Sequence, residues 1–448
     1  MVLKMRKMKD SGIEWIGEIP EGWSVSKVLH CLSMPITDGP HTTPILYDTG
    51  IPFVSAEAVS CGNGRIDFSH IRGYISEQFY KECCQKYIPE IDDIYMIKSG
   101  ATTGRVAIVD TTRVFTIWSP LAVFRCNKDC MLPKFLYYYL QSPAFQKEVE
   151  FGWTFGTQQN VGMRSLEQMK VCVPQLNKQD TIANYLDNQC SQIDLLLQKA
   201  LTSIEEYKKL KQAVITQAVT KGVRGEREMK DSGVEWIGEI PKYWNIGKLK
   251  YYWISVESGV SVNAADRPID NPAQYGVLKT SSVSKFIFNP HEHKQVNNDE
   301  YSRVTCPVTA DCIIVSRMNT PDLVGACGYV EKTYPNLFLP DRLWQISFKN
   351  DVSAKFIWYY LNNKMVRSYI SSLSTGTSST MQNISQGQFG NISVCLPDSN
   401  EQKEIADYLD AKCAEIDKLI AKKDQLVKEL ESYKKSLIYE VVTGKREV

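Results

Sequence analysis

One phrase occurs twice in this chain of 448 residues. Residues 8–20 read MKDSGIEWIGEIP and residues 229–241 read MKDSGVEWIGEIP, and Trp23 and Trp244 lie three residues past the final proline of each copy. A repeat of about half the chain indicates a duplicated domain, because the units of solenoid proteins span only about 20–50 residues. Two copies of one module in one polypeptide predict a protein that binds two similar targets at a fixed separation.

The duplication continues far beyond this phrase. The segment 134–140 (KFLYYYL) is matched by 355–361 (KFIWYYL) at the same offset of 221 residues. IANYLD at 182–187 is matched by IADYLD at 405–410, which begins 223 residues later, so the second copy has gained two residues. Two repeats therefore account for nearly the whole sequence.

The loops between the shared blocks diverge. KSGATTGR at 98–105 corresponds to SRMNTPDLVGA at 316–326, although the surrounding frame is still similar. A common frame with unlike loops is what two readers of different targets would need. Neutral drift of surface loops is the alternative interpretation.

Composition limits the class of protein. With 43% hydrophobic and 23% charged residues, each half can bury an ordinary globular core. The 13 cysteines include no CxxC pair, the N-terminal residues are charged, and no run of 18 apolar residues occurs. We therefore expect reduced thiols, a cytoplasmic protein and no membrane partner. The net charge is +1, so any positive potential for nucleic acid must be local.

Two long segments are predicted to be helices. Residues 179–219 and 401–443 contain neither glycine nor proline, and apolar residues recur in both at alternating steps of four and three. This pattern is a heptad seam sustained for over three heptads. The seam residues are Ile193, Leu197, Ile204, Tyr207 and Val214 in the first segment, and Ile416, Ile420, Val427, Leu430 and Leu437 in the second. We expect the two helices to pack together within the chain as an antiparallel coiled coil.

Lys211 and Lys434 interrupt the seam at equivalent positions. A polar residue in a seam can fix the register of two helices. A lysine that extends its ammonium to water is the commoner case, and this interpretation is favoured here.

The predicted fold class is α+β. Two similar globular α/β domains are separated by the two long helices, and the whole chain is a pseudo-two-fold internal repeat. The predicted domains are head 1 (1–176), spacer 1 (177–224), head 2 (225–397) and spacer 2 (398–448).

Short β-rich runs broken by Gly, Pro, Asn and Asp clusters fill residues 24–131 and 245–352. A helix is expected after each, at about 133–150 and 353–371. Its aromatic stripe (Phe135 and Tyr139, Phe356 and Tyr360) is interpreted as core rather than as a base-stacking platform. Likewise, the repeated tryptophans Trp15, Trp23, Trp236 and Trp244 are interpreted as packing where head meets helix.

A polar loop follows the helix in both copies, GTQQNV at 156–161 and GTSSTMQNI at 376–384. Gln and Asn amides can bind adenine edges in the major groove of DNA, and Ser or Thr can bind either base or phosphate. An ordinary Gly-Thr turn is the alternative interpretation. The candidate DNA-binding residues are His41, Thr42, Thr43, Lys98, Thr102, Thr103, Arg105, Thr157, Gln158, Gln159 and Asn160 in head 1, and Lys279, Arg317, Asn319, Thr377, Ser378, Ser379, Gln382 and Asn383 in head 2.

Signatures of nucleic-acid catalysis are missing from the sequence. There is no [DN]-P-P-[YFW] tetrapeptide and no G-x-x-x-x-G-K-[ST] phosphate loop. PDSNEQK at 397–403 faintly resembles a nuclease carboxylate set, but it is better interpreted as a helix N-terminus because the first copy lacks those carboxylates. His291 and His293 are too sparse for a metal site. We expect no catalytic residue, no metal and no cofactor bound by this chain.

The repeated MKDSGxEWIGEIPxxW phrase and the PxxxxQxxIAxYLD helix ending in VT together resemble the specificity subunit of type I restriction-modification enzymes. The resemblance covers essentially the whole chain, and DG-x-H-x-x-P at 38–44 is also similar to that family. The second head has no clear counterpart of this motif, and VESGVSVNAADRP at 256–268 occupies the region.

The resemblance implies two target-recognition domains, each reading one half of a bipartite site on double-stranded DNA. Because the loops of the two heads differ, we expect the site to be asymmetric. The resemblance also implies a non-catalytic chain that binds two modification subunits, which methylate adenine with S-adenosylmethionine, and restriction subunits that cleave. A scaffold that does not bind DNA, and an enzyme without familiar motifs, are the alternatives.

Overall fold

The computed structural model describes residues 6–155, 159–378 and 381–448. The chain forms two compact units: the first extends to Leu201 and includes Asp424–Val448, and the second is Thr202–Lys423. Each unit contains one head and a part of each long helix. The predicted domain boundaries stay a prediction.

Head 1 is built around a four-stranded antiparallel sheet in the order β4-β10-β7-β8 and also contains a three-stranded sheet β6-β5-β9. The two central strands, IYMI and LAVF, are buried along their full length, so they read as continuous apolar runs. The strands are β1 (Met8–Asp10), β2 (Glu18–Pro20), β3 (Ser24–Lys27), β4 (Thr37–Asp38), β5 (Ile51–Val54), β6 (Tyr74–Ile75), β7 (Ile94–Ile97), β8 (Val106–Ile108), β9 (Thr116–Ile117), β10 (Leu121–Phe124), β11 (Trp153–Phe155), β12 (Gln159–Val161) and β13 (Lys170–Val173). The helices are η1 (Val28–Cys31), α1 (Ala56–Cys61), η2 (Phe68–His70), α2 (Glu77–Cys84), α3 (Pro133–Gln141), α4 (Pro143–Phe151) and α5 (Met163–Gln168).

Head 2 repeats this order in the sheet β17-β26-β22-β24 and adds a five-stranded sheet β18-β20-β19-β25-β21. Its strands are β14 (Met229–Asp231), β15 (Glu239–Pro241), β16 (Asn245–Lys248), β17 (Trp253–Ser258), β18 (Ala264–Ala265), β19 (Gly276–Leu278), β20 (His293–Val296), β21 (Pro307–Val308), β22 (Cys312–Ser316), β23 (Met318–Asn319), β24 (Cys327–Val330), β25 (Tyr334–Phe338), β26 (Leu343–Phe348), β27 (Thr375–Ser378), β28 (Met381–Asn383) and β29 (Ser393–Leu396). Its helices are η3 (Leu249–Tyr251), η4 (Thr280–Val283), η5 (Asn298–Arg303), α7 (Ala354–Leu361), α8 (Lys364–Leu373) and α9 (Gln386–Gly390).

The single helix expected after each β-rich region is wrong, because two helices stand in its place. In head 1 the break falls at Ser142, whose side chain accepts a hydrogen bond from Phe145 N, and Pro143 begins α4. In head 2 the side chain of Asn363 accepts from Met365 N at the start of α8. The aromatic stripe of α3 and α7 is fully buried, which confirms its interpretation as core.

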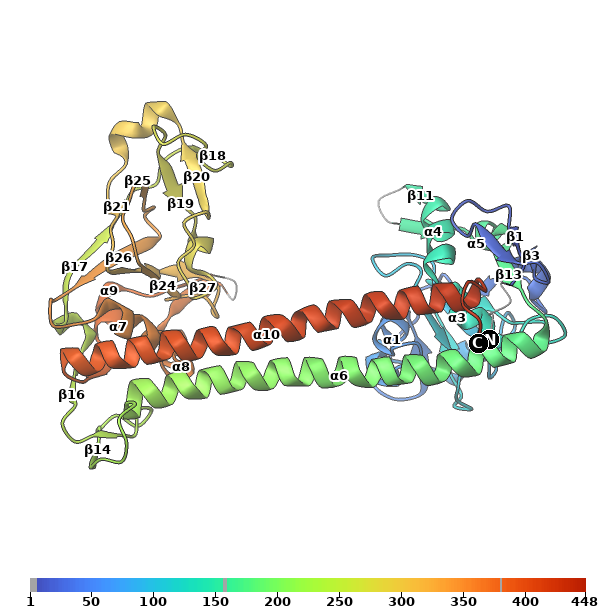
Figure 1. The fold of residues 1–448 in the computed structure, drawn as a ribbon, viewed down its shortest axis with the longest axis horizontal. Helices are drawn as coiled ribbons and strands as arrows, with labels where there is room; N and C mark the ends of the chain where they lie inside the picture. The colour runs from blue at the N-terminus through green and yellow to red at the C-terminus, as the bar shows by residue number, and fades with distance from the viewer. Residues whose placement is uncertain (1–5, 156–158, 379–380) are drawn as a thin grey trace. The chain divides into compact units, whose positions relative to one another are not determined.

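The long helices are α6 (Leu176–Lys221) and α10 (Ser399–Val442). In the first unit the beginning of α6 packs against the end of α10, where Ile193 and Leu437 share one apolar cluster. In the second unit the end of α6 packs against the beginning of α10, where Ile215 and Leu409 share another. The predicted antiparallel pairing within the chain is thus confirmed in each unit (Figure 1).

The ten predicted seam residues are all buried or half-buried, while off-seam residues of the same helix such as Leu195 and Leu196 are exposed. Asp398 caps α10, accepting from the N–H groups of Asn400 and Glu401, so the interpretation of 397–403 as a helix N-terminus is confirmed.

The two seam lysines form partly exposed ion pairs with the opposite helix, which the favoured interpretation of them did not foresee. In the second unit Lys211 Nζ contacts both carboxylate oxygens of Asp417 at 2.8 and 2.7 Å. In the first unit Lys434 Nζ contacts Asp194 Oδ1 at 2.6 Å. Each lysine finds an aspartate one residue past a seam position of the opposite helix, so the two ion pairs are equivalent under the internal repeat.

The glutamine of the repeated PxxxxQ motif joins each head to its helix. Buried Gln179 accepts from Leu132 N at 2.7 Å and donates to the carbonyls of Cys130 and Pro174 at 2.8 and 2.9 Å. Buried Gln402 repeats this pattern with Ser353 N, Asp351 O and Pro397 O at 2.7, 3.1 and 3.0 Å. The motif recurs because its buried glutamine satisfies three backbone groups with hydrogen bonds where the head meets the helix.

A second repeated joint involves the aspartate of the IAxYLD phrase. Tyr138 donates to Asp187 at 2.8 Å, and Tyr359 donates to Asp410 at 2.7 Å. Trp23 and Trp244 lie buried in the same head–helix cores, which confirms their predicted packing role.

Candidate nucleic-acid interface

Two of the loops selected from the sequence meet in head 1. Lys98 follows the buried strand β7, and its carbonyl accepts a hydrogen bond from Val161 N at 2.9 Å. Gly100 N donates to Gln159 O at 3.0 Å, so the 98–105 loop is fastened to the hairpin β11–β12. The tertiary structure thus brings KSGATTGR and the described part of the Gly-Thr loop together.

A third loop joins them through Asp38, at the end of β4. This buried carboxylate pairs with Lys98 Nζ at 3.1 Å, with His41 Nε2 at 3.2 Å and with Lys86. Burial raises the pKa of Asp38, but the bonds to Lys86 and Lys98 lower it by more, so the pKa lies below its ordinary value. The carboxylate is ionised at neutral pH and contacts the side chains of two lysines and one histidine.

The members of this cluster differ in access to solvent. The Lys98 side chain is 12% exposed, whereas that of His41 is 72% exposed. Thr42 and Thr43 follow His41 in the same exposed loop, and Gln159 and Asn160 are exposed on the hairpin. Thr157 and Gln158 lie outside the described residues.

The remaining candidates of head 1 have local or different contacts. Thr103 Oγ1 donates to Gly100 O at 2.7 Å, and Thr102 is half-buried in the same turn. Arg105 Nη1 donates to Ser60 O at 3.0 Å and lines a cavity of about 830 Å³. The other lining residues of this cavity include Lys434 of α10, so Arg105 faces the helix pair.

Head 2 repeats the junction of loop and hairpin. Arg317 follows the buried strand β22, and its carbonyl accepts from Ile384 N at 3.0 Å. The next residues form β23, which pairs with β28 of the polar loop. Gln382 and Asn383 are half-buried on β28.

The other candidates of head 2 are placed as follows. Asn319 turns its side chain to Ser316 and to the N–H of Thr320, which indicates a turn-forming role. Lys279 pairs with Asp266 at 3.2 Å. Thr377 and Ser378 belong to the backbone of β27, and the side chains of both, like the whole of Ser379, lie outside the described residues.

Ser258 and Gly259 occupy in head 2 the place of Asp38 and Gly39, a correspondence that sequence reasoning missed. Asp38 pairs with Ala122 of β10, and Ser258 pairs with Trp344 of β26 at the same register. A Cβ on Gly39 would lie 2.0 Å from the Ile117 carbonyl oxygen, and one on Gly259 would lie 1.6 Å from that of Leu339. Both sites therefore require glycine. The only sequence feature that the two sites share is this glycine, because the residues around it differ between the heads.

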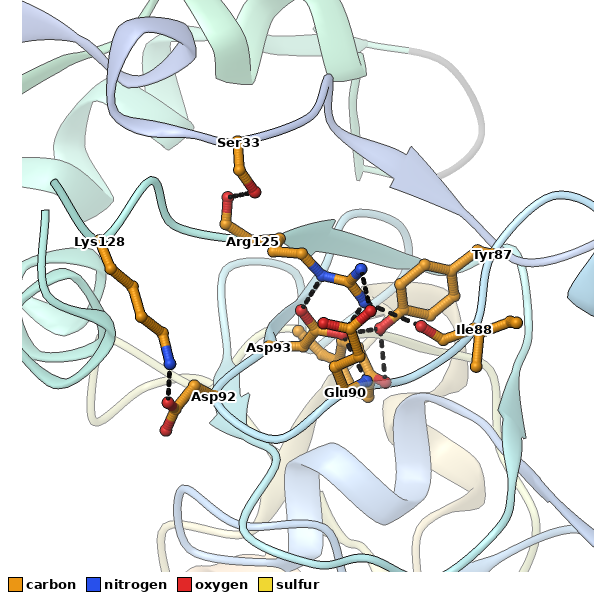
Figure 2. Close-up of polar contacts among 9 residues, drawn as sticks. Ser33, Tyr87, Ile88, Glu90, Asp92, Asp93, Arg125 and Lys128 are labelled. Carbon is orange, nitrogen blue, oxygen red and sulfur yellow. Dashed lines mark hydrogen bonds and ion pairs between the residues drawn. The ribbon is translucent and has the colours of Figure 1, made fainter.

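A buried polar network braces the strands that carry the head 1 cluster (Figure 2). Arg125 grips Asp93 with two hydrogen bonds of 2.7 and 2.8 Å and reaches Glu90 at 2.6 Å. The Tyr87 hydroxyl also donates to Asp93, and burial raises its pKa, so the phenol stays neutral. On the flank of this network Lys128 pairs with Asp92 at 2.6 Å. The network fixes the end of β10 against the loop that precedes β7.

No group of three or more His, Cys, Asp or Glu side chains in the part of the chain that the structure describes is arranged to hold a metal ion. No helix within the described ranges is both long and apolar enough to cross a membrane.

The fold and its paired sites define a duplicated head-and-helix protein. A family model described as the type I restriction modification DNA specificity domain matches residues 42–206 and 274–429, once in each repeat. These matches cover well over half of the sequence. The chain therefore belongs to the family of type I restriction-modification specificity proteins.

Individual relatives agree with this assignment. A Methanocaldococcus jannaschii protein assigned as the specificity subunit of type I restriction enzyme MjaX is 28% identical over 442 residues, which are 96% of this chain and 95% of the relative. A structure from work on complex assembly and conformational transition of the type I R-M system matches with a TM-score of 0.71 at 13% identity, over 95% of this chain and 98% of its own. The HsdS subunit of Thermoanaerobacter tengcongensis matches with a TM-score of 0.51 at 14% identity, over 96% and 98%. At these identities the two structures support the fold alone.

Proposed function

We propose that this chain is the DNA-recognition subunit of a type I restriction-modification complex and that each head reads one half of an asymmetric bipartite site. The observation that carries the proposal is the equivalent junction in both heads, where a cation after a buried strand is fastened to a polar hairpin. The fastening is shared, but the side chains differ, as expected for two different half-sites. In head 1 the exposed polar groups of the 41–43 loop and of the hairpin supply contacts to bases and phosphates.

The paired helices set the number of unread base pairs between the half-sites in this proposal. Support comes from α6 and α10, which run without a break for 46 and 44 residues. The ion pairs of Lys211 and Lys434 with the opposite helix favour a single register of the pair.

We assign neither methylation nor cleavage to this chain. Two modification subunits, which carry S-adenosylmethionine, methylate adenine, and restriction subunits cleave the DNA. The chain binds double-stranded DNA and docks these partners in the cytoplasm. The lack of a catalytic motif in the sequence supports this division of labour.

A head exchange tests the proposal directly. Residues 24–175 are replaced by those of a relative, the complex is reassembled with its modification subunit, and the methylated sequence is mapped. Only one half-site should change, and a change in both halves would contradict the two-head proposal.

The salt dependence of binding separates DNA recognition from a scaffold role. Phosphate contacts release counterions, so the affinity of the complex for its site should fall steeply with salt. A scaffold whose heads bind only proteins predicts no salt-dependent DNA affinity in the reconstituted complex.

A further inference from the structure

The two heads place a cation at the same backbone position but surround it differently. Lys98 and Arg317 lie directly after β7 and β22, the strands that pair with β10 and β26. Their carbonyls accept hydrogen bonds from Val161 N, at the end of β12, and from Ile384 N, directly after β28. Asp38, which pairs with Lys98 in head 1, is replaced by Ser258 at the same strand register of head 2. The internal repeat therefore supplies a natural comparison of one site with and without a carboxylate.

In head 1 the ammonium group of Lys98 is neutralised by a carboxylate inside the protein. Lys98 is mostly buried and ion-paired to Asp38, whose side chain has no solvent exposure. The same carboxylate holds Lys86 and His41, which remain substantially exposed. The positive charge that faces solvent is therefore carried by Lys86 and, when protonated, by His41, and Lys98 fixes the base of the hairpin.

In head 2 the cation has no such partner. Ser258 Oγ donates to backbone carbonyls, among them Leu343 O at 3.1 Å, so it is occupied by the turn. Among the residues that the structure describes, the buried Nε of Arg317 has no hydrogen-bond partner, and Arg317 forms no ion pair with a carboxylate. Asn383 Oδ1, on the strand paired with β23, is a second buried polar atom that lacks a partner within the described ranges.

A buried donor without a partner is a cost to the free protein, and a ligand that accepts from it recovers that cost. We infer that Arg317 is a direct DNA contact of head 2, whereas its counterpart Lys98 is a positioning residue held by Asp38. The guanidinium suits acceptor atoms in a forked arrangement, which both a guanine edge and a phosphate present. This inference rests on the proposed DNA-recognition function.

The test uses the full-length chain in its complex with the modification subunit, and a duplex that carries the mapped site. Arg317→Ala should weaken binding on the order of 10- to 100-fold, the range expected for loss of one bidentate contact. Methylation specificity in the half-site of head 1 should be unchanged. The melting temperature should stay the same or rise, because the variant removes an unpartnered donor, whereas a structural role for Arg317 predicts a fall.

The pattern of the loss identifies the contact. If Arg317 binds a guanine edge, discrimination is relaxed at one position of the head 2 half-site. If it binds a phosphate, binding weakens for all sequences, and the slope of affinity against salt falls by about one.

The matched control is Lys98→Ala in head 1. Its effect on DNA binding should come with faster hydrogen exchange of the hairpin β11–β12, and Lys98→Arg should restore both, because an arginine can still pair with Asp38. Arg317→Ala that binds and methylates as the parent does, or that loses hairpin protection as Lys98→Ala does, would overturn the inference. A parent complex without sequence-specific, salt-dependent DNA binding would instead refute the proposed function itself.

Discussion

The four-stranded sheets of the two heads have the same strand order, yet one equivalent position holds a charged pair in head 1 and neutral residues in head 2. Asp93 and Arg125 form a buried ion pair at the edge of β7 and β10. At the same register of head 2, Cys312 pairs with Ser347, and Cys312 donates to the neighbouring Gln345. A buried ion pair can be replaced by neutral residues at little cost in stability, but removal of one partner leaves the other charge buried without a counter-charge. Two heads from one ancestral repeat therefore keep the frame while their buried polar groups differ.

The largest loss of stability should come from removing one partner of the Asp93–Arg125 ion pair in head 1. Arg125→Ala leaves Asp93 buried without its counter-charge, which should cost about 3–5 kcal/mol of unfolding free energy in head 1. The matched change Ser347→Ala in head 2 should cost less than about 1 kcal/mol. Hydrogen exchange of the β7 and β22 amides measures both in the intact chain. Equal effects would show that the two sheets are stabilised alike.

The head–helix joints should respond equally, in contrast to the sheets. Gln179→Leu and Gln402→Leu each keep the volume but leave one N–H and two carbonyls unsatisfied, and each should destabilise its own unit by about 1–3 kcal/mol per stranded group. Urea unfolding followed by hydrogen exchange in each unit reads out the two effects. A large difference between the two variants would contradict the equivalence of the joints.

Acid should distinguish the two heads at the Asp38 cluster of head 1. The pKa of Asp38 is lowered in the folded protein, so its contribution to stability is complete above its ordinary pKa of about 3.8 and is lost as pH falls through the lower folded value. Ser258 does not titrate in this range. Below about pH 4, Asp38→Ser should therefore reduce the pH dependence of hydrogen exchange in β4, while β17 keeps the same profile. An unchanged profile in β4 would show that the carboxylate does not hold the cluster.

The smallest effect concerns the helix pair. Asp194→Asn and Asp417→Asn remove the partners of Lys434 and Lys211, and each should cost at most about 1 kcal/mol because the pairs are partly exposed. Thermal unfolding at low and high salt checks this, since the parent's advantage should shrink with salt. A cost that persists at high salt would point to packing rather than charge.

The fold was predictable wherever the repeat or the residue period was strong. Heptad spacing predicted the helix pairing, because an apolar stripe on an isolated helix needs a partner and the second copy supplies one. Boundaries were less accessible, and the expected helices over 133–150 and 353–371 each proved to be two, because Ser142 and Asn363 cap a new helix at the break. The seam lysines were misjudged because their aspartates lie on the other helix, more than 200 positions away in sequence.

The candidate site was predicted in its parts but not in its assembly. His41, Lys98 and Gln159 were selected separately, as polar residues in loops. His41 and Lys98 meet at Asp38, and the hairpin that carries Gln159 is bonded to the loop after Lys98; both depend on strand register in a sheet whose neighbours are distant in sequence. Ser258–Gly259 escaped notice because only the glycine is shared, and its requirement is set by the approach of another strand's carbonyl.

The sequence by itself determined the duplication, the paired helices and the family, because periodicity and repeated phrases are properties of the chain order. Only the tertiary structure decided which cations are paired and which are free. Lys98 and Arg317 occupy equivalent backbone positions directly after β7 and β22, but a carboxylate from a neighbouring strand neutralises Lys98 and not Arg317. Electrostatic partnership depends on distances of a few ångströms in space, and chain order does not encode these locally.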